Sequence, residues 1–473
     1  MAELTGRARP VPLESLFEQL QPRPGGPAPE QVASHQRARL YRAMVEAAAE
    51  GGYGAVTMRR LTALAGVSTR TFYEQFSGKE DCFIRTYDVV VRSLTKKIIS
   101  AQRAGQDWDA RARLAIAAFA HSVASEPKAA QLALVETFTA GPASRQRSEH
   151  SSQLFERMVT VCSQHTSEPL ELPPLVIKAV VAGLARVARA RLLQGRAAEL
   201  PQLVEELSAW VLSYCSPVTA LLDDLTSEPS QPLGGLLGER TGGALDPAEP
   251  PPGDDRTRIL LAALHIAGTR GVLSLSPGAI ARSAEVSESA FSELFDDGYQ
   301  CIISALEHAY RWELQRIVSA GIAAHDWQSG VQRALTTLAY DIANEPVRAN
   351  VAFAEVLALG RTGIDCRESL MRGFARALAT SARHPLRLSE VVAEAIVGAL
   401  WEIIRHHLVR GEGWRLPQIT GQLSYLVLTP VIGAQAAAQS IRAEQARLNA
   451  RVIERHKTEV EQRFKRSGLA SAT

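Results

Sequence analysis

Apolar residues recur along most of this chain at intervals of three and four positions, the period of an amphipathic α-helix. The first apolar face is formed by Leu40, Met44, Ala47 and Ala48, and a longer apolar stripe follows between about residues 80 and 104. Apolar residues make up 46% of the chain and charged residues 22%, and the abundant Ala, Leu, Arg and Glu favour helix over strand. The sequence therefore predicts an all-α protein.

The helical pattern occurs twice. Residues 65–76 (AGVSTRTFYEQF) and 284–295 (AEVSESAFSELF) agree at six of twelve positions with an offset of 219. The same offset relates further pairs, which are Cys82 and Cys301, Trp108 and Trp327, Pro127 and Pro346, Glu136 and Glu355, and Gly141 and Gly360. We interpret the two tryptophans as core residues. Repetition over this length predicts two tandem units of roughly two hundred residues each.

Two short helices are predicted to follow the first one. Thr57 is placed to cap a helix whose inward residues are Met58, Leu61, Leu64 and Ala65. Gly66 supplies a tight turn, and Ser68 can cap the next helix. In that helix Val67, Phe72 and Phe76 face the core, whereas the outward residues are Thr69, Arg70, Thr71, Tyr73 and Gln75. This layout is typical of a helix-turn-helix with a recognition helix.

Residues 57–83 (TMRRLTALAGVSTRTFYEQFSGKEDCF) resemble the DNA-binding motif of the TetR family of transcriptional regulators, including the Phe-Tyr and Lys-Glu pairs. The resemblance implies that residues 69–71 face the major groove, while Tyr73 and Lys79 bind phosphates. An Arg side chain can donate two hydrogen bonds to one guanine, and phosphate contacts fix the register of the protein on the duplex. Arg70 stands where the family often has Gly, so base preference cannot be transferred. The predicted DNA-binding residues are Arg59, Arg60, Thr69, Arg70, Thr71, Tyr73, Gln75 and Lys79.

The resemblance also implies a helical ligand-binding and dimerisation domain behind each helix-turn-helix. Predicted helices at about 172–195 and 200–221 stand where the family places its dimerisation helices. A ligand pocket is expected among the middle helices, at about 110–170 and 328–385. The apolar composition there is compatible with an apolar effector and equally with an ordinary core.

The second copy keeps the apolar positions and loses the predicted contacts. Thr69, Arg70, Thr71, Tyr73 and Lys79 align with Glu288, Ser289, Ala290, Ser292 and Gly298. Four basic residues and one acidic residue give residues 57–79 a formal charge of +3, whereas one basic and five acidic residues give 276–298 a charge of −4. An acidic surface repels phosphate, so the second motif is predicted to be a degenerate helix-turn-helix with a structural role.

Composition and alignment together set the expected domain boundaries. Residues 1–35 and 223–255 are rich in Pro and Gly, which predicts a disordered arm and a linker. The remaining expected domains are a helix-turn-helix at 36–80, a helical domain at 81–222, a degenerate helix-turn-helix at 256–299, a second helical domain at 300–434 and a charged C-terminal helix at 435–473.

Several classes of function find no support in the sequence. The 52 basic and 50 acidic residues leave a net charge of only +2, so any basic surface must be local. Five scattered cysteines indicate reduced thiols, and neither a zinc motif nor a catalytic set is present. There is no signal peptide and no membrane-spanning apolar run. We expect a cytoplasmic protein that is not an enzyme and uses no cofactor or metal.

The sequence thus predicts a transcriptional regulator, specifically a repressor, that binds a double-stranded DNA operator. The two units would form an internal pseudo-dimer, with a small, apolar effector controlling DNA affinity. Since the internal dimer would contain one helix-turn-helix able to bind DNA, we hypothesise that two chains associate on one operator. The alternative is a helical interaction or scaffold protein that uses the acidic second unit or the C-terminal helix to bind a protein partner.

Overall fold

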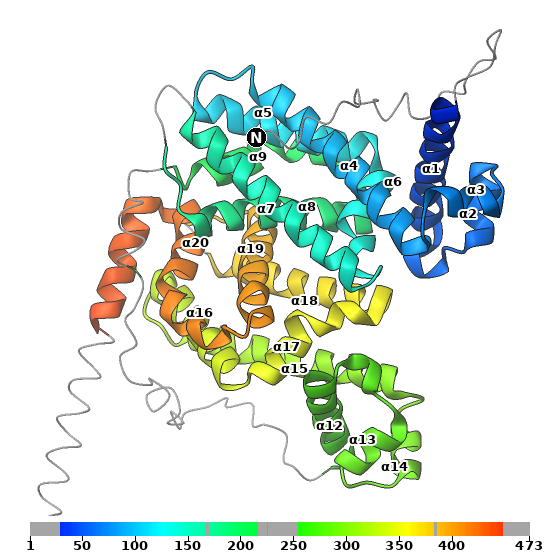
Figure 1. Cartoon of the computed structure of the whole chain (residues 1–473). Coiled ribbons are helices and arrows are strands. Elements are labelled where there is room, and N and C mark those ends of the chain that lie inside the picture. Colours follow the sequence, from blue (N-terminus) through cyan, green and yellow to red (C-terminus); the bar gives the residue numbers. More distant parts are fainter. Residues whose placement is uncertain (1–28, 166–169, 216–224, 226–253, 383–385, 448–473) are drawn as a thin grey trace, which may run out of the picture. The chain divides into compact units, whose positions relative to one another are not determined.

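The computed structural model describes residues 29–165, 170–215, 225, 254–382 and 386–447 (Figure 1). Within these ranges every regular element is a helix, which confirms the predicted fold class. The chain divides into two compact units: unit 1 comprises residues 1–170 and 184–208, and unit 2 comprises residues 171–183 and 209–473. In the described part of the chain, no helix is long and apolar enough to cross a membrane.

Unit 1 begins with a long helix, α1, that runs from Pro29 to Ala55 and is kinked at Gly52. Residues 29–35, which were expected to belong to a disordered arm, are therefore helical, and residues 1–28 lie outside the described residues. The later elements that start in this unit are α2 (Met58–Ala65), α3 (Thr69–Gln75), α4 (Lys79–Gln102), α5 (Trp108–Ser125), α6 (Pro127–Leu134), η2 (Glu136–Phe138), α7 (Pro142–Gln164), η3 (Ala197–Leu203) and α9 (Val204–Leu212). Helix α8 (Pro174–Leu193) contributes its second half.

Unit 2 is also built from helices within the described residues. Its helices are α12 (Asp255–Arg270), η5 (Val272–Ser274), α13 (Pro277–Ser283), α14 (Glu288–Leu294), α15 (Gly298–Ile322), α16 (Trp327–Asn344), α17 (Pro346–Phe353), η6 (Glu355–Leu359), α18 (Gly360–Ser381), α19 (Glu390–Val409), η7 (Gly413–Ile419) and α20 (Thr420–Ile432). Apart from Leu225, Asp254 and Asp255, the linker expected at 223–255 lies outside the described residues.

Unit 2 also includes residues from before the expected linker, so the compact units do not follow the predicted boundary at residue 222. Tyr214 lies wholly buried there and donates its hydroxyl to the backbone carbonyl of Leu426 over 2.6 Å. Gly183 approaches the backbone of α19 so closely that a Cβ at this position would lie 2.8 Å from the carbonyl oxygen of Ala395. Residues 171–183 and 209–215 are thus part of the core of unit 2.

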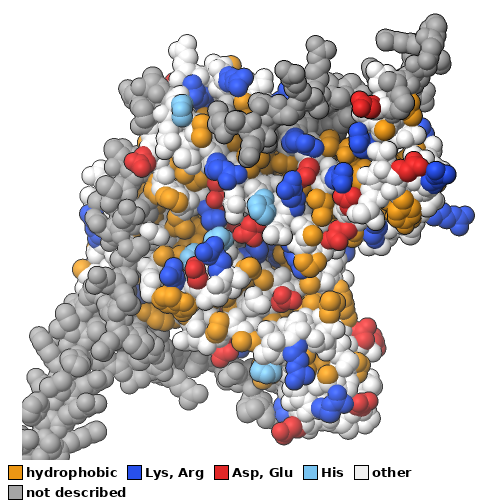
Figure 2. Space-filling view, in the orientation of Figure 1, with side chains coloured by type: hydrophobic (Ala, Val, Ile, Leu, Met, Phe, Trp, Pro, Cys, Tyr) orange, Lys and Arg blue, Asp and Glu red, His pale blue; other side chains and the backbone are white. Residues whose placement is uncertain are grey.

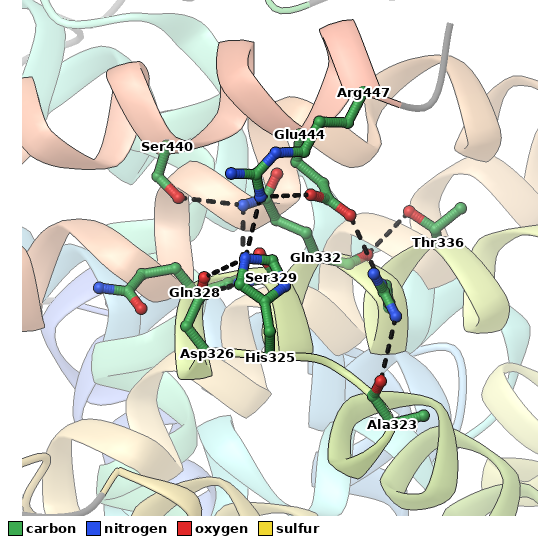
Figure 3. Close-up of polar contacts among 11 residues, drawn as sticks. Ala323, His325, Asp326, Gln328, Ser329, Gln332, Thr336, Ser440, Glu444 and Arg447 are labelled. Atoms are coloured by element: carbon green, nitrogen blue, oxygen red, sulfur yellow. Dashed lines mark hydrogen bonds and ion pairs between the residues drawn. The ribbon is translucent and has the colours of Figure 1, made fainter. Parts of the chain in front are cut away.

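Residues 434–447 form a helix that packs on α16, as Figure 3 shows. The Gln332 side-chain amide donates to Ser440 Oγ over 3.2 Å, and Arg447 Nη1 lies 2.9 Å from His325 Nε2. Arg333 pairs with the buried Glu444 at 3.4 Å. The predicted C-terminal helix therefore exists over these residues, and residues 448–473 lie outside the described part.

Candidate nucleic-acid interface

A common core fixes α1, α2 and α3 against the start of α4. Leu40 and Met44 from α1, Leu61 from α2, Phe72 from α3 and Phe83 from α4 are all fully buried in one cluster. Complete burial of each such side chain stabilises the fold by about 1.5–3 kcal/mol. Because α3 contributes only seven residues, Phe72 and the adjoining Phe76 hold its orientation.

Side-chain caps define where the two short helices begin. Thr57 Oγ1 accepts the backbone N–H of Arg60 at 3.2 Å, and Ser68 Oγ accepts that of Thr71 at 3.0 Å, as the sequence predicts. Gly66 ends α2 in the left-handed region with φ 58°. Arg39 on α1 donates to the Gly66 carbonyl at 3.1 Å, which brings an exposed guanidinium to the turn. Sequence reasoning missed Arg39, although its place on the polar face of α1 was readable.

The outer face of α3 presents the residues expected to read DNA. The side chain of Arg70 is 90% exposed and pairs with Glu74 of the next turn at 3.1 Å. Thr69 is exposed, while Tyr73 is 57% exposed and rests edge-on against the buried Phe72 ring. Exposed i,i+4 ion pairs contribute only about 0.3–0.5 kcal/mol, so Glu74 can release Arg70 to a stronger partner.

The remaining predicted residues divide between exposed and partly engaged positions. Thr71 is half-buried, with its hydroxyl 2.9 Å from Ser68 Oγ, and Gln75 is also half-buried. Arg59 is exposed, whereas Arg60 forms an ion pair with Glu50 of α1. Figure 2 shows Lys and Arg side chains projecting from the surface over α2 and α3. The predicted positive charge is therefore present at the surface of the motif.

Lys79 is more engaged than the sequence suggested. Its ammonium donates to the Tyr53 backbone carbonyl at 3.3 Å and lies 4.2 Å from the centre of the Tyr53 ring. Partial burial lowers the pKa of this Lys79 ammonium. To bind a phosphate, the Lys79 ammonium would either keep these contacts with Tyr53 or exchange them for the phosphate. The role of Lys79 remains a prediction.

Leu64 is the one residue of α2 whose predicted inward position is wrong, because it is 50% exposed. The buried residues of this helix are Leu61, Thr62 and Ala65. At 3.6 residues per turn, Leu64 lies roughly a third of a turn away from the centre of that stripe. The Thr62 hydroxyl donates to the Met58 carbonyl, so a polar side chain takes a place on the buried side of this helix.

The second motif has the same frame with a different surface. Ser276 and Ser287 cap α13 and α14, and Pro277 occupies the first turn of α13, as predicted. Phe291 and Phe295 are buried. Glu285 has φ 56°, the left-handed conformation that Gly66 adopts 219 positions earlier. All five acidic residues of this motif are exposed, namely Glu285, Glu288, Glu293, Asp296 and Asp297.

Unit 2 contains a cavity of about 870 Å³ that is partly open to solvent, between α15, α16, α17, α18 and α19. Its wall is mainly apolar, and Trp312, Trp327 and Trp401 are among the residues that line it. Trp327 was interpreted as a core residue and instead borders this cavity, whereas Trp108 is buried as expected. The volume lies in the range of small-molecule sites.

Other chemistry is sparse in the described residues. They contain no group of three or more His, Cys, Asp or Glu residues that could hold a metal ion. All five cysteines are free thiols, and burial raises the pKa of Cys82 and of Cys301 to about 12. Thiols with such pKa values are poor nucleophiles at neutral pH. The described fold is helical, and its exposed cationic motif lies on α2 and α3.

Comparison with known proteins shows what the motif is similar to. Residues 40–86 match the family of bacterial regulatory proteins named tetR, which supports a DNA-binding transcriptional regulator. Among solved structures, the fatty acid degradation regulator FadR from Bacillus halodurans is 19% identical, with 37% of this chain and 94% of that chain covered and a TM-score of 0.35. FadR from Bacillus subtilis, solved in complex with stearoyl-CoA, is 16% identical, with 38% and 98% covered and a TM-score of 0.35. No curated protein matches the chain.

Proposed function

We propose that this protein is a sequence-specific transcriptional repressor that reads DNA through α3 of unit 1. The observation that carries the proposal is the pair of exposed side chains, Arg70 and Tyr73, on a recognition helix whose own core residue, Phe72, is fully buried. A rigidly held helix with exposed hydrogen-bond donors can enter a major groove. There a bidentate contact between Arg and guanine contributes about 1–3 kcal/mol of discrimination against other bases. Tyr73 and Lys79 are assigned to phosphates.

The second motif is assigned a structural role as partner in an internal pseudo-dimer. Two features of unit 2 favour this assignment. Its core includes residues 171–183 and 209–215, which belong to the first copy of the sequence repeat. The buried hydrogen bond from Tyr214 to Leu426 and the close approach of Gly183 to Ala395 join helices at positions expected for dimerisation. Such an arrangement holds only one motif competent for DNA.

Two chains are therefore assigned to one operator, so that two N-terminal motifs act together. A single motif binds DNA weakly, and linking two readers raises the overall affinity through effective concentration. An effector bound in the cavity of unit 2 would control the affinity by favouring one arrangement of the chain over another, with a leverage limited by its differential affinity for the two.

Selection of bound duplexes from a random DNA pool with the intact chain tests the proposal. We expect a short motif to be enriched, in two inverted copies about one helical turn apart. Light scattering of the complex should then give two chains for each duplex. Absence of any enriched motif would overturn the DNA-reading proposal, and a mass of one chain on a full operator would overturn the two-chain arrangement.

The rival function, a helical scaffold for a protein partner, draws on the exposed acidic surface of the second motif. The same selection separates the two functions, because a scaffold enriches no DNA sequence. For a scaffold, the decrease in DNA affinity with rising salt would be no larger than nonspecific DNA contacts produce.

A further inference from the structure

The cavity of unit 2 contains two carboxyl groups in an apolar surrounding. Glu313 on α15 and Asp341 on α16 both line it, together with residues such as Leu314, Leu335 and Phe353. One oxygen of each group, Glu313 Oε1 and Asp341 Oδ2, is buried and receives no hydrogen bond from any other described residue, while the two carboxyl groups lie within hydrogen-bonding reach of each other. Buried carboxyl oxygens without a donor are costly, so the pair requires a positive charge or a proton.

Neighbouring side chains satisfy the pair only in part. Arg316 donates to Asp341 Oδ1 at 2.9 Å, and its guanidinium also lies 4.6 Å from the centre of the Trp312 ring. Burial and the charge of Asp341 raise the pKa of Glu313 to about 7, so near neutrality Glu313 shares a proton with Asp341. That proton occupies a place that a ligand cation can take.

This pair is specific to unit 2. The residues 219 positions earlier are Leu94 and Ser122, neither of which ionises. Trp312 corresponds to Ser93, and Arg348, which also lines the cavity and lies 5.5 Å from the Trp312 ring, corresponds to Ala129. Unit 2, which lacks the predicted DNA-binding residues, thus has charged side chains along its cavity where the first copy has uncharged ones.

We propose that the cavity of unit 2 binds an amphiphile with a primary ammonium head, which Glu313 and Asp341 hold while the apolar walls enclose its hydrocarbon body. An ammonium carries three donors and one positive charge, so it can neutralise the pair in place of the shared proton. A carboxylate head would be repelled by the pair, which keeps one negative charge even when it shares a proton. The proposal rests on the proposed function, since it names the effector class, and binding without DNA tests it separately.

The test compares three probes of one chain length, dodecylammonium, 1-dodecanol and dodecanoate, on the full chain without DNA. Trp312, Trp327 and Trp401 line the cavity, so intrinsic fluorescence reports binding. We expect dodecylammonium to bind at least about tenfold more tightly than dodecanol, because a charged hydrogen bond contributes roughly 1.5–3 kcal/mol. Equal or tighter binding of dodecanoate, or no saturable binding of dodecylammonium, overturns the proposal.

Variants then assign the preference to the pair. Glu313→Gln combined with Asp341→Asn should leave dodecanol affinity within about twofold and remove the preference for dodecylammonium. The matched control is Glu307→Gln, an exposed carboxylate on the same helix that does not line the cavity, which should change nothing. A preference that survives the double substitution overturns the assignment. If dodecylammonium binds as described but leaves DNA affinity unchanged, the ligand class stands and effector control of DNA binding fails.

Discussion

The segment α2–α3 and the segment α13–α14 have similar capped and buried positions and differ in their exposed residues. Phe72 and Phe291 are both fully buried at the same point of the recognition helix, and Ser68 and Ser287 cap that helix in the same way. Core truncations typically cost 2–5 kcal/mol, whereas surface substitutions away from special features cost within about 0.5 kcal/mol. The buried residues are thus constrained because the stability of the fold depends on them, whereas the outer residues can differ at little cost in stability. A shared fold therefore does not imply shared DNA binding.

The largest predicted effect comes from replacing the buried phenylalanine of each recognition-helix position. Phe72→Ala and Phe291→Ala should each destabilise their own motif by about 3–5 kcal/mol, because each leaves a large cavity. Hydrogen exchange measures this loss separately in the two motifs. Only Phe72→Ala should abolish DNA binding. Equal loss of DNA affinity in both variants would mean that the second motif takes part in recognition.

A smaller effect concerns the carboxyl pair that distinguishes the cavity of unit 2. Burial and the nearby Asp341 raise the pKa of Glu313 to about 7, above its usual value of 4.5. The folded protein therefore holds a proton that the unfolded chain releases between about pH 4.5 and 7, so this group makes stability fall as pH rises through that window. Above pH 7 the full penalty is on the order of 3 kcal/mol.

Urea unfolding of the wild type and Glu313→Gln at pH 5 and pH 8 measures this difference. The variant should gain more stability relative to the wild type at pH 8 than at pH 5, since glutamine cannot ionise. Comparing the two proteins at each pH cancels the other titrating groups. The same difference at both pH values would show that Glu313 does not titrate in this range.

The smallest predicted effect is at the turn of each motif. Gly66→Ala should destabilise unit 1 by about 1 kcal/mol, because a left-handed conformation is strained for a residue with a Cβ. Glu285→Gly should stabilise unit 2 by about 0.5 kcal/mol, since it relieves the same strain at some cost in chain entropy. Thermal unfolding of the two variants checks the opposite signs. A loss of stability in both would mean that Glu285 makes contacts that outweigh its backbone strain.

Sequence patterns predicted local structure best. The caps at Thr57 and Ser68 and the turn at Gly66 were readable because each depends on a few neighbouring residues. Leu64 was placed wrongly, because helical periodicity alone does not fix the rotation of an eight-residue helix about its axis. The beginning of α1 at Pro29 was missed because Pro at a first turn resembles the preceding Pro-rich segment.

Long-range features could not be predicted from the sequence. The contact of Lys79 with Tyr53 joins positions 26 residues apart and depends on how α1 and α4 meet. Trp327 borders a cavity whose wall comes from several distant helices, so no local signal separates it from a core tryptophan such as Trp108. The Glu313 and Asp341 pair is likewise brought together by two different helices. Each of these features is a product of packing.

The most direct test of the central claim compares two matched double variants on the duplex recovered by selection. Arg70→Ala with Tyr73→Ala removes the outer residues of α3, and Ser289→Ala with Ser292→Ala changes the residues 219 positions later. By fluorescence anisotropy, we expect the first variant to lose at least about thirtyfold in affinity, because one phosphate contact and one base contact are lost, and to lower the slope of affinity against salt by at most about 1, because the positive charge of Arg70 is lost. The second should bind within about twofold of the wild type. Unchanged affinity in the first variant, or an equal loss in the second, would contradict the account.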